Sequence, residues 1–243
     1  MTQVTVKHLW KEFDGQVVLE NVNLQVDDHE FVTIVGASGC GKTTFLKMLL
    51  GIESPSRGSF LIDGEPLAAE PGPDRGIVFQ RYSLFPHLTV MNNLLLGLEL
   101  RDARLFGRLF GARRRRALER ARELLEAVGL QAAVDKYPAQ LSGGMQQRLS
   151  IAQSVICEPK ILLLDEPFGA LDPGITSDMH TLILKLWNMN KMTIFMVTHD
   201  LKESFALGTR LLVFDKVRVD AQAPEAFGAT ITFNIPLKGH RDS

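Results

Sequence analysis

The sequence predicts an α/β fold in which a mainly parallel β-sheet is interrupted by a helical subdomain. In the last third of the chain, short apolar strands alternate with helical segments, a pattern typical of parallel sheets with crossover helices. From about residue 89 to 157, apolar residues instead recur at spacings of three and four, with almost no strand pattern. We therefore expect one domain, 1–243, with a core at about 1–88 and 158–243 and a helical subdomain at about 89–157.

Apolar patterns mark the individual strands and helices of the core. Residues 22–26 alternate between apolar and polar, as in a half-buried strand. Residues 31–35 form an apolar run that stops at Gly36, which is typical of a strand buried on both faces. A helix is expected over 43–50, with Gly51 as its C-cap. Further strands are expected at 59–62, 77–79, 161–164, 193–197 and 211–214, and further helices at 175–190 and 201–207.

Composition and charge restrict the possible functions. A net charge of -1 with 45% hydrophobic residues argues against bulk nucleic-acid binding and fits a globular domain. No apolar run approaches the roughly 18–20 residues that span a bilayer, and the N-terminus has no signal-peptide block. The two cysteines, Cys40 and Cys157, are too far apart to indicate a disulfide framework or a zinc site. We expect a cytoplasmic protein that reaches any membrane through a partner.

A glycine-rich loop follows the 31–35 strand and begins the next helix. Its residues, Gly36, Ala37, Ser38, Gly39, Cys40, Gly41, Lys42 and Thr43, match G-x-x-x-x-G-K-[ST] at every fixed position. Glycines let successive backbone N–H groups turn toward phosphate oxygens, and the helix N-terminus adds its positive end. Lys42 is expected to contact the β- and γ-phosphates and Thr43 to bind Mg²⁺. With Thr44, this segment predicts a nucleotide site; the alternative is a chance glycine-rich turn.

Two adjacent acids end a later buried strand. Four apolar residues, 161–164, are followed by Asp165 and Glu166. Asp165 is placed to hold the water shell of a magnesium ion, and Glu166 to polarise an attacking water. Adjacent acids at a strand end could instead cap a loop, but Pro167 and the upstream glycine-rich loop favour the catalytic interpretation.

Further segments resemble the signatures of ABC ATPases. Residues 141–148, LSGGMQQR, resemble the LSGGQ signature, with Met145 where Gln is usual. Gln80 resembles the Q-loop glutamine, His199 the switch histidine, and residues 168–172 the D-loop. These motifs occur in the family's order over nearly the whole chain. The resemblance implies a P-loop NTPase core with an N-terminal antiparallel β element and an inserted α-helical subdomain.

The resemblance also implies a head-to-tail dimer that hydrolyses ATP. ATP bound at the glycine-rich loop of one subunit would be covered by Ser142, Gly143 and Gly144 of a second ATPase subunit. The simplest second subunit is another copy of this chain. Gln80 would contact Mg²⁺ and sense the transport subunit, and His199 would contact the γ-phosphate. The candidate catalytic residues are thus Glu166, His199 and Gln80, and the candidate metal ligands are Thr43, Gln80 and Asp165.

One aromatic residue is placed like the ring that stacks on adenine in this family. Phe13 stands just ahead of the Asp14-Gly15 pair, and phenylalanine keeps the π-face of the tyrosine that is common there. The alternative is that Phe13 is simply part of the core.

The type of transporter is indicated by the segment before Gln80. Residues 71–80, PGPDRGIVFQ, are similar to importer ATPases of the nitrate, sulfonate and taurine group, and residues 82–86 agree. Residues 214–220 and 230–235 resemble a branch linked with urea-carboxylase or guanidine metabolism. An importer ATPase would sit peripherally on the cytoplasmic face of the inner or plasma membrane. Its partners would be a transmembrane permease and, indirectly, a solute-binding protein, with no nucleic acid; the substrate is read by other subunits.

Three other functions fit the sequence less well. Soluble ABC ATPases of DNA repair or translation usually have a long coiled coil or two cassettes, whereas the gap from Lys42 to Ser142 is short here. A regulator that only binds ATP would not need Glu166 and His199. An exporter ATPase is commonly fused to its membrane span, and no span occurs in this sequence.

Two features leave alternatives open. Residues 101–116 interleave arginines with leucine and phenylalanine. They could form a solvated helical insertion, or an element near the bilayer with arginines toward anionic lipid; nucleic-acid binding is least favoured. Cys40 is either a tolerated small residue or, in an electropositive loop, an unusually reactive thiol that ATP would protect.

Overall fold

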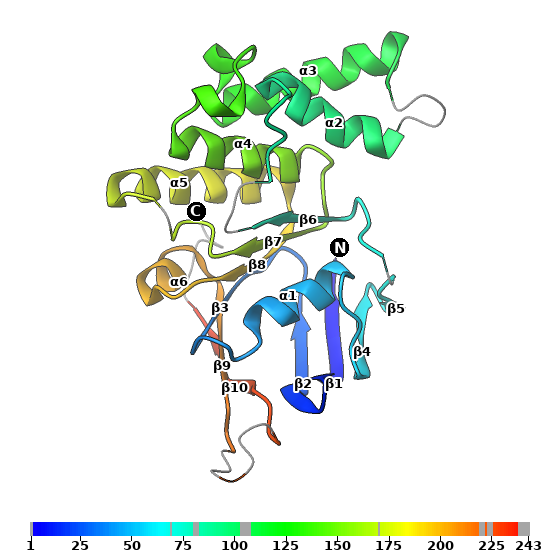
Figure 1. Ribbon diagram of the computed structural model, residues 1–243, viewed down its shortest axis with the longest axis vertical. Helices are drawn as coiled ribbons and strands as arrows, with labels where there is room; N and C mark the ends of the chain where they lie inside the picture. Colours follow the sequence, from blue (N-terminus) through cyan, green and yellow to red (C-terminus); the bar gives the residue numbers. More distant parts are fainter. Residues whose placement is uncertain are drawn as a thin grey trace.

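Two β-sheets and a group of helices form the layers of the protein (Figure 1). The computed structural model describes residues 2–68, 70–79, 83–102, 108–169, 171–218, 222 and 226–237. No helix within these ranges is long and apolar enough to cross a bilayer.

The smaller sheet is antiparallel and lies near the N-terminus. It has the strand order β2-β1-β4-β5, formed by β1 (Val4–Phe13), β2 (Gln16–Val26), β4 (Arg57–Ile62) and β5 (Glu65–Pro66). β1 and β2 are joined by Asp14 and Gly15, which both have positive φ angles, 47° and 85°. An Asp-Gly pair in this conformation is the favoured two-residue hairpin turn. The antiparallel N-terminal element predicted from the sequence is therefore confirmed.

The larger sheet is parallel except at one edge. Its order is β10-β9-β3-β8-β7-β6, formed by β10 (Thr230–Pro236), β9 (Arg210–Asp215), β3 (Phe31–Gly36), β8 (Thr193–Val197), β7 (Ile161–Asp165) and β6 (Arg75–Val78). Only β10 runs antiparallel. The sheet is buried on both faces, because Leu162 and Leu164 pack with the helical side while Ile161 and Leu163 pack on the other side. The carboxyl ends of β3, β7 and β8 consequently lie side by side.

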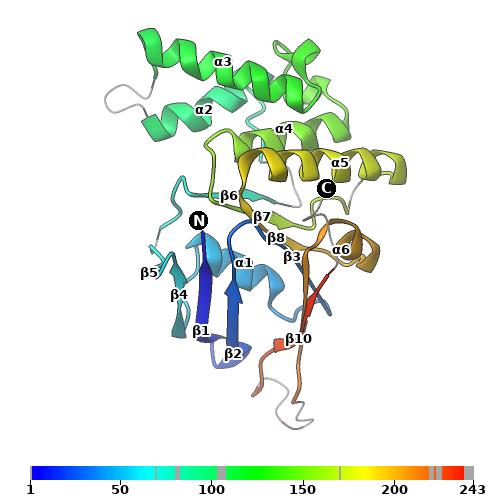
Figure 2. The ribbon, with the colours of Figure 1, turned by 180° about the vertical axis from the view of Figure 1, so that it is seen from behind.

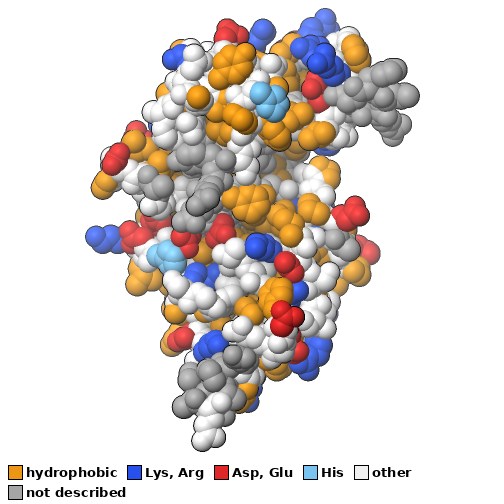
Figure 3. All heavy atoms as spheres, viewed as in Figure 1, with side chains coloured by type: hydrophobic (Ala, Val, Ile, Leu, Met, Phe, Trp, Pro, Cys, Tyr) orange, Lys and Arg blue, Asp and Glu red, His pale blue; other side chains and the backbone are white. Residues whose placement is uncertain are grey.

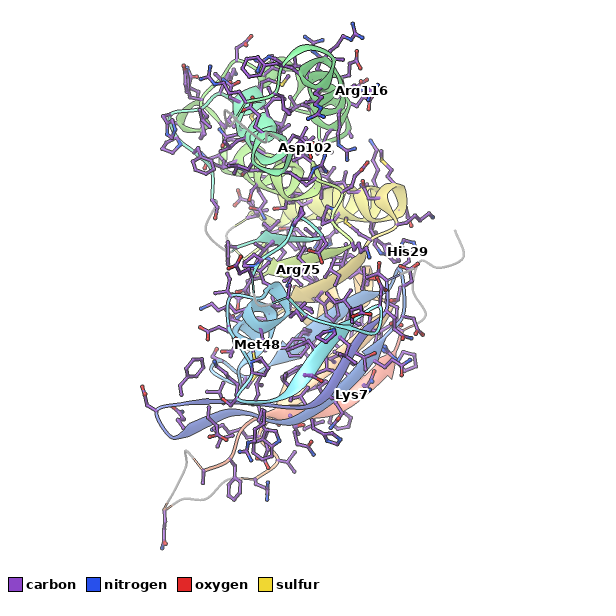
Figure 4. All side chains as sticks on the ribbon, turned by 90° about the vertical axis from the view of Figure 1, so that its right-hand side faces the viewer. Lys7, His29, Met48, Arg75, Asp102 and Arg116 are labelled. Carbon is purple, nitrogen blue, oxygen red and sulfur yellow. The ribbon has the colours of Figure 1, made fainter. Side chains whose placement is uncertain are left out.

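Helix α1 (Lys42–Leu50) contacts both sheets. Its Phe45 ring lies 5.5 Å from Phe60 of β4 and 5.4 Å from Phe214 of β9, measured between ring centroids. The helix ends at Gly51, a left-handed C-cap as predicted. The buried guanidinium of Arg75 donates to the carbonyl oxygen of Leu50 at 3.0 Å and so satisfies one of the terminal acceptors of the helix (Figure 4).

The remaining helices lie on the other side of the larger sheet (Figure 2). They are α2 (Val90–Asp102), α3 (Gly111–Ala127), α4 (Gly143–Val155), α5 (Pro173–Asn190) and α6 (Leu201–Leu207), with short 3₁₀ turns at Gln131–Ala133 and Pro138–Gln140. One apolar core joins α2, α3, α4 and α5 to the sheet, with Leu94, Leu149 and Ile183 fully buried in it. The helices expected over about 89–157 are confirmed by α2, α3 and α4; residues 103–107, which precede α3, lie outside the described residues.

Candidate functional site

Close packing around the glycine-rich loop requires glycine at two of its positions. A Cβ atom on Gly36 would lie 2.2 Å from the carbonyl oxygen of Phe214 in β9. Gly41 is the N-cap of α1 with φ of +83°, and a Cβ there would lie 2.8 Å from Leu19 of β2. The loop is thus held closely against both sheets, with the N-terminus of α1 at its end.

An open pocket of about 450 Å³ lies in front of this loop. It is lined by residues from the β1–β2 hairpin, the loop, α1 and the ends of β7 and β8: Phe13, Gln16, Val18, Ser38, Gly39, Gly41, Lys42, Thr43, Thr44, Glu166 and His199. The volume lies within the usual range for small-molecule sites. Phe13 presents a 40% exposed ring to solvent, and the Lys11 ammonium lies 4.4 Å from its centroid.

Lys42 folds back over the loop. Its Nζ donates to the carbonyl oxygens of Gly36 at 2.8 Å and Ala37 at 2.9 Å, and the residue is 6% exposed. These bonds hold the ammonium at the centre of the loop, where it contributes a positive charge beside the N-terminus of α1.

Thr43 and Asp165 meet between α1 and β7. The Thr43 hydroxyl donates to Asp165 Oδ1 at 3.3 Å. Burial raises the pKa of Asp165, and the neighbouring Glu166 carboxylate raises it further, while the Thr43 hydrogen bond opposes both. No group of three His, Cys, Asp or Glu side chains suited to a metal occurs in the part of the chain described above.

Glu166 and His199 meet because β7 and β8 are neighbours in the sheet. Each residue follows the end of its strand, and His199 Nε2 is in contact with Glu166 Oε1. Glu166 has a left-handed φ of +50°, and its N–H donates to the Val197 carbonyl at 3.0 Å. A residue other than glycine is strained in this backbone conformation, and such strained residues are common at functional sites. The pair faces the loop across the pocket.

The segment around His199 is fixed by contacts that the sequence did not indicate. The Thr198 hydroxyl donates to Glu203 of α6 and accepts from the Asp200 N–H at 3.0 Å. On the neighbouring strand end, buried Gln147 of α4 donates to the Pro167 carbonyl at 2.6 Å, directly after Glu166. In the sequence, these contacts could have been suspected only from the short polar run 198–200. Such residues are typical of a helix N-cap, and Asp200 indeed caps α6.

Some predicted residues do not line this pocket. Ser142 is the N-cap of α4, where its hydroxyl accepts from the Met145 N–H at 3.3 Å, and Gly143 and Gly144 begin that helix. All three are absent from the pocket lining, as are Gly36, Ala37 and Cys40. Gln80 lies outside the described residues, so its roles stay predictions.

Two pocket residues were missed. Gln16 and Val18, at the start of β2, line the pocket beside Phe13. The Asp14-Gly15 turn could have identified them, because a two-residue hairpin places the start of β2 beside the end of β1.

We expect Cys40 to react slowly with a thiol reagent and ATPase activity to fall as it does. Its side chain is only 5% exposed, and Lys42 Nζ lies 3.8 Å from its Sγ, so an adduct displaces the lysine from the loop. Bound ATP should slow the labelling further, because it would occupy the pocket in front of the loop. The measurement is peptide mass spectrometry alongside ATPase activity, with Cys40→Ser as the variant that controls for Cys157. Full activity after complete labelling of Cys40 contradicts this expectation.

Comparison with known proteins agrees with this site. The ABC transporter family matches residues 19–169. The nitrate import ATP-binding protein of Synechocystis is 40% identical over 220 residues, which cover 90% of this chain and 77% of that protein. The aliphatic sulfonates import ATP-binding protein of Bacillus cereus is 37% identical over 86% of this chain and 80% of its own. A dimeric ATP-binding cassette solved in a post-hydrolysis state with ADP and phosphate superposes with a TM-score of 0.77 at 28% identity, covering 98% of this chain and all of that one. This chain belongs to the ABC transporter family and is one of its ATP-binding, ATP-hydrolysing subunits.

Proposed function

We propose that this chain drives an importer, coupling ATP hydrolysis in a head-to-tail dimer to uptake through a separate transmembrane permease. The observation that carries the proposal is the separation of Ser142, Gly143 and Gly144 from the ATP pocket. These residues begin helix α4, where a serine hydroxyl and free N–H groups suit a phosphate. A second subunit, facing the first, would supply them. The dimeric relative and the importer names of the similar proteins support this arrangement.

Within one subunit, the pocket residues take the following roles. Lys42 and the N–H groups of the loop bind the β- and γ-phosphates, with Thr44 beside them. Phe13 stacks on the adenine ring. Glu166 orients the attacking water and accepts its proton, and His199 holds Glu166 in place and contacts the γ-phosphate.

Thr43 and Asp165 fit a magnesium ion. Hydroxyl and carboxylate oxygens are hard ligands that Mg²⁺ prefers, and the two side chains lie within 3.3 Å of each other. The desolvated Asp165 carboxylate, whose pKa is raised by burial, gains from a neighbouring cation. When bound, the ion would neutralise charge on the β- and γ-phosphates. Gln80 would complete the protein ligands.

The permease would dock on a groove between the core, at about 1–88 and 158–243, and the helical subdomain, at about 89–157. The groove has a volume of about 340 Å³ and is lined by Pro73, Arg75, Gly76, Ile77, Phe79, Ser83, Phe85, Ser150, Gln153, Ser154 and Cys157. Ser154 of α4 donates to the Ile77 carbonyl at 2.6 Å, which closes its floor. The half-exposed Phe85 ring offers an apolar contact for a helix of the permease. In the sequence, Gln80 lies between the groove residues 73–79 and 83–85. Through Gln80, docking of the permease would therefore be coupled to the ATP pocket.

Affinity capture from gently solubilised membranes tests this proposal. The wild-type chain should recover a multi-span permease on the cytoplasmic face of the membrane, together with a solute-binding protein. Phe85→Asp should lose the permease, because a charge would be buried in the groove. Met189→Asp, a matched change at an exposed position of α5, should retain it. Recovery of the wild-type chain without any membrane protein would instead favour a soluble ATPase of DNA repair or translation.

A further inference from the structure

A second cavity lies between the end of α2 and the start of α3, away from the ATP pocket. It has a volume of about 580 Å³ and is lined by Leu98, Arg101, Asp102, Leu109, Arg113, Arg116, Ala117 and Arg120. The leucines and Ala117 are buried and form an apolar floor, while the arginines form the rim. Figure 4 shows Asp102 and Arg116 on the two neighbouring helices, and Figure 3 shows basic side chains gathered over this end of the molecule. None of the lining residues is shared with the ATP pocket.

Two of the four arginines have structural roles. Arg101 donates to the Cys157 carbonyl at 3.0 Å, and Arg120 donates to the Ile156 carbonyl at 2.8 Å. Both bonds satisfy acceptors at the C-terminal end of α4. Arg101 is also paired with both oxygens of Asp102, at 2.7 and 2.8 Å, and this pairing lowers the pKa of Asp102. Asp102 is thus engaged by Arg101, and the nearby charge of Arg113 also lowers its pKa.

Arg113 and Arg116 have exposed side chains, with no hydrogen bond or ion pair to any residue that the structure describes. They stand three residues apart, so they lie on the same face of α3 and repel each other. Arg113 lies in the first turn of that helix, where the helix dipole disfavours cations. The first turn has no acidic residue, and the N-cap residue, Phe110, offers no side-chain acceptor. Two positive charges that have no hydrogen bond to a described residue therefore meet at the rim of one cavity.

We propose that this cavity binds a phosphate-bearing anion. Arg113 and Arg116 bind the phosphate, and the apolar floor receives the organic part of the ligand. The ligand is either a free phosphorylated compound or the headgroup of an anionic phospholipid, since both present the same chemistry. The site goes beyond the proposed import function and does not depend on it. Through Arg101 and Arg120 the cavity is attached to the end of α4 opposite to Ser142.

Two binding experiments on the full chain test the proposal. The protein is first saturated with a non-hydrolysable ATP analogue and Mg²⁺, so that its phosphate loop is occupied. Glycerol 3-phosphate is then titrated calorimetrically, and flotation is measured with phosphatidylcholine vesicles with and without phosphatidylglycerol. The variant is Arg113→Gln with Arg116→Gln. The matched control, Arg115→Gln with Arg122→Gln, removes the same charge from exposed positions of the same helix outside the cavity.

We expect at least one probe to bind the wild-type chain, with binding weakened by salt. The Arg113 and Arg116 variant should lose about tenfold or more in affinity, while the control keeps the wild-type value. Binding of glycerol 3-phosphate alone identifies a soluble ligand; flotation only with phosphatidylglycerol identifies a lipid headgroup. Absence of binding by both probes, or an equal loss in variant and control, overturns the proposal.

Discussion

Glu166→Gln retains ATP binding but lowers the rate of hydrolysis by about 10²–10⁴-fold, the contribution typical of a general base. Glutamine has nearly the same shape as glutamate and still offers an oxygen to His199 Nε2, so the pocket keeps its geometry. It cannot accept the proton of the attacking water, because an amide is not basic. The loss therefore falls on the chemical step and leaves nucleotide affinity unchanged.

Phosphate release and equilibrium binding of a fluorescent ATP analogue separate these two effects. Gel filtration with ATP should also show that the dimer accumulates, because the ATP-bound dimer would no longer be separated by hydrolysis. His199→Ala is the informative comparison. It removes the partner of Glu166 and the proposed γ-phosphate contact but keeps the proposed proton acceptor, so its loss of rate should be smaller. Hydrolysis by Glu166→Gln at the wild-type rate would mean that another group activates the water.

The predictable parts of the fold are those in which burial shows directly in the sequence. Strands β3, β7 and β8 are buried on both faces, and such strands are read as apolar runs with abrupt ends. The functional motifs stand at those ends, so their approximate positions followed from the strands. Arg75 could not be interpreted in this way. Its partner, the carbonyl of Leu50, lies 25 positions away in the sequence. Every residue has a backbone carbonyl, so the residue type does not show which carbonyl accepts the bond.

The motifs predict several residues that line the pocket, but the sequence does not predict how these residues are arranged. The motifs identify Glu166 and His199 separately, whereas their contact depends on β7 lying next to β8 in the strand order. Cys40 shows the same limit. A glycine-rich loop suggests exposure, but left-handed Gly39 and Gly41 on either side turn the intervening residue, and the thiol packs into the core. The local sequence pattern thus identifies the residues of the site. Contacts between distant parts of the chain determine how their side chains are oriented.

Lys42→Ala should weaken ATP binding itself by about 10- to 100-fold, because charge-assisted hydrogen bonds to phosphate contribute roughly 1.5–3 kcal/mol. The substitution also leaves the carbonyls of Gly36 and Ala37 without the donor that they have now. Lys42→Met keeps most of the side-chain volume but has neither the charge nor the donor, so it separates the loss of the ammonium from the loss of side-chain packing.

Equilibrium binding and thermal unfolding, measured together, distinguish a lost phosphate contact from a damaged loop. If Lys42→Ala and Lys42→Met lose affinity equally while only the alanine variant unfolds earlier, the ammonium acts mainly on the phosphates and its stem packs the loop. Lys7→Ala, which removes an exposed charge from β1 far along the smaller sheet, should change neither quantity. Normal ATP affinity in both Lys42 variants would mean that the loop N–H groups and Thr43 suffice for binding. The ammonium, held at the loop carbonyls, would then be a structural element of this site.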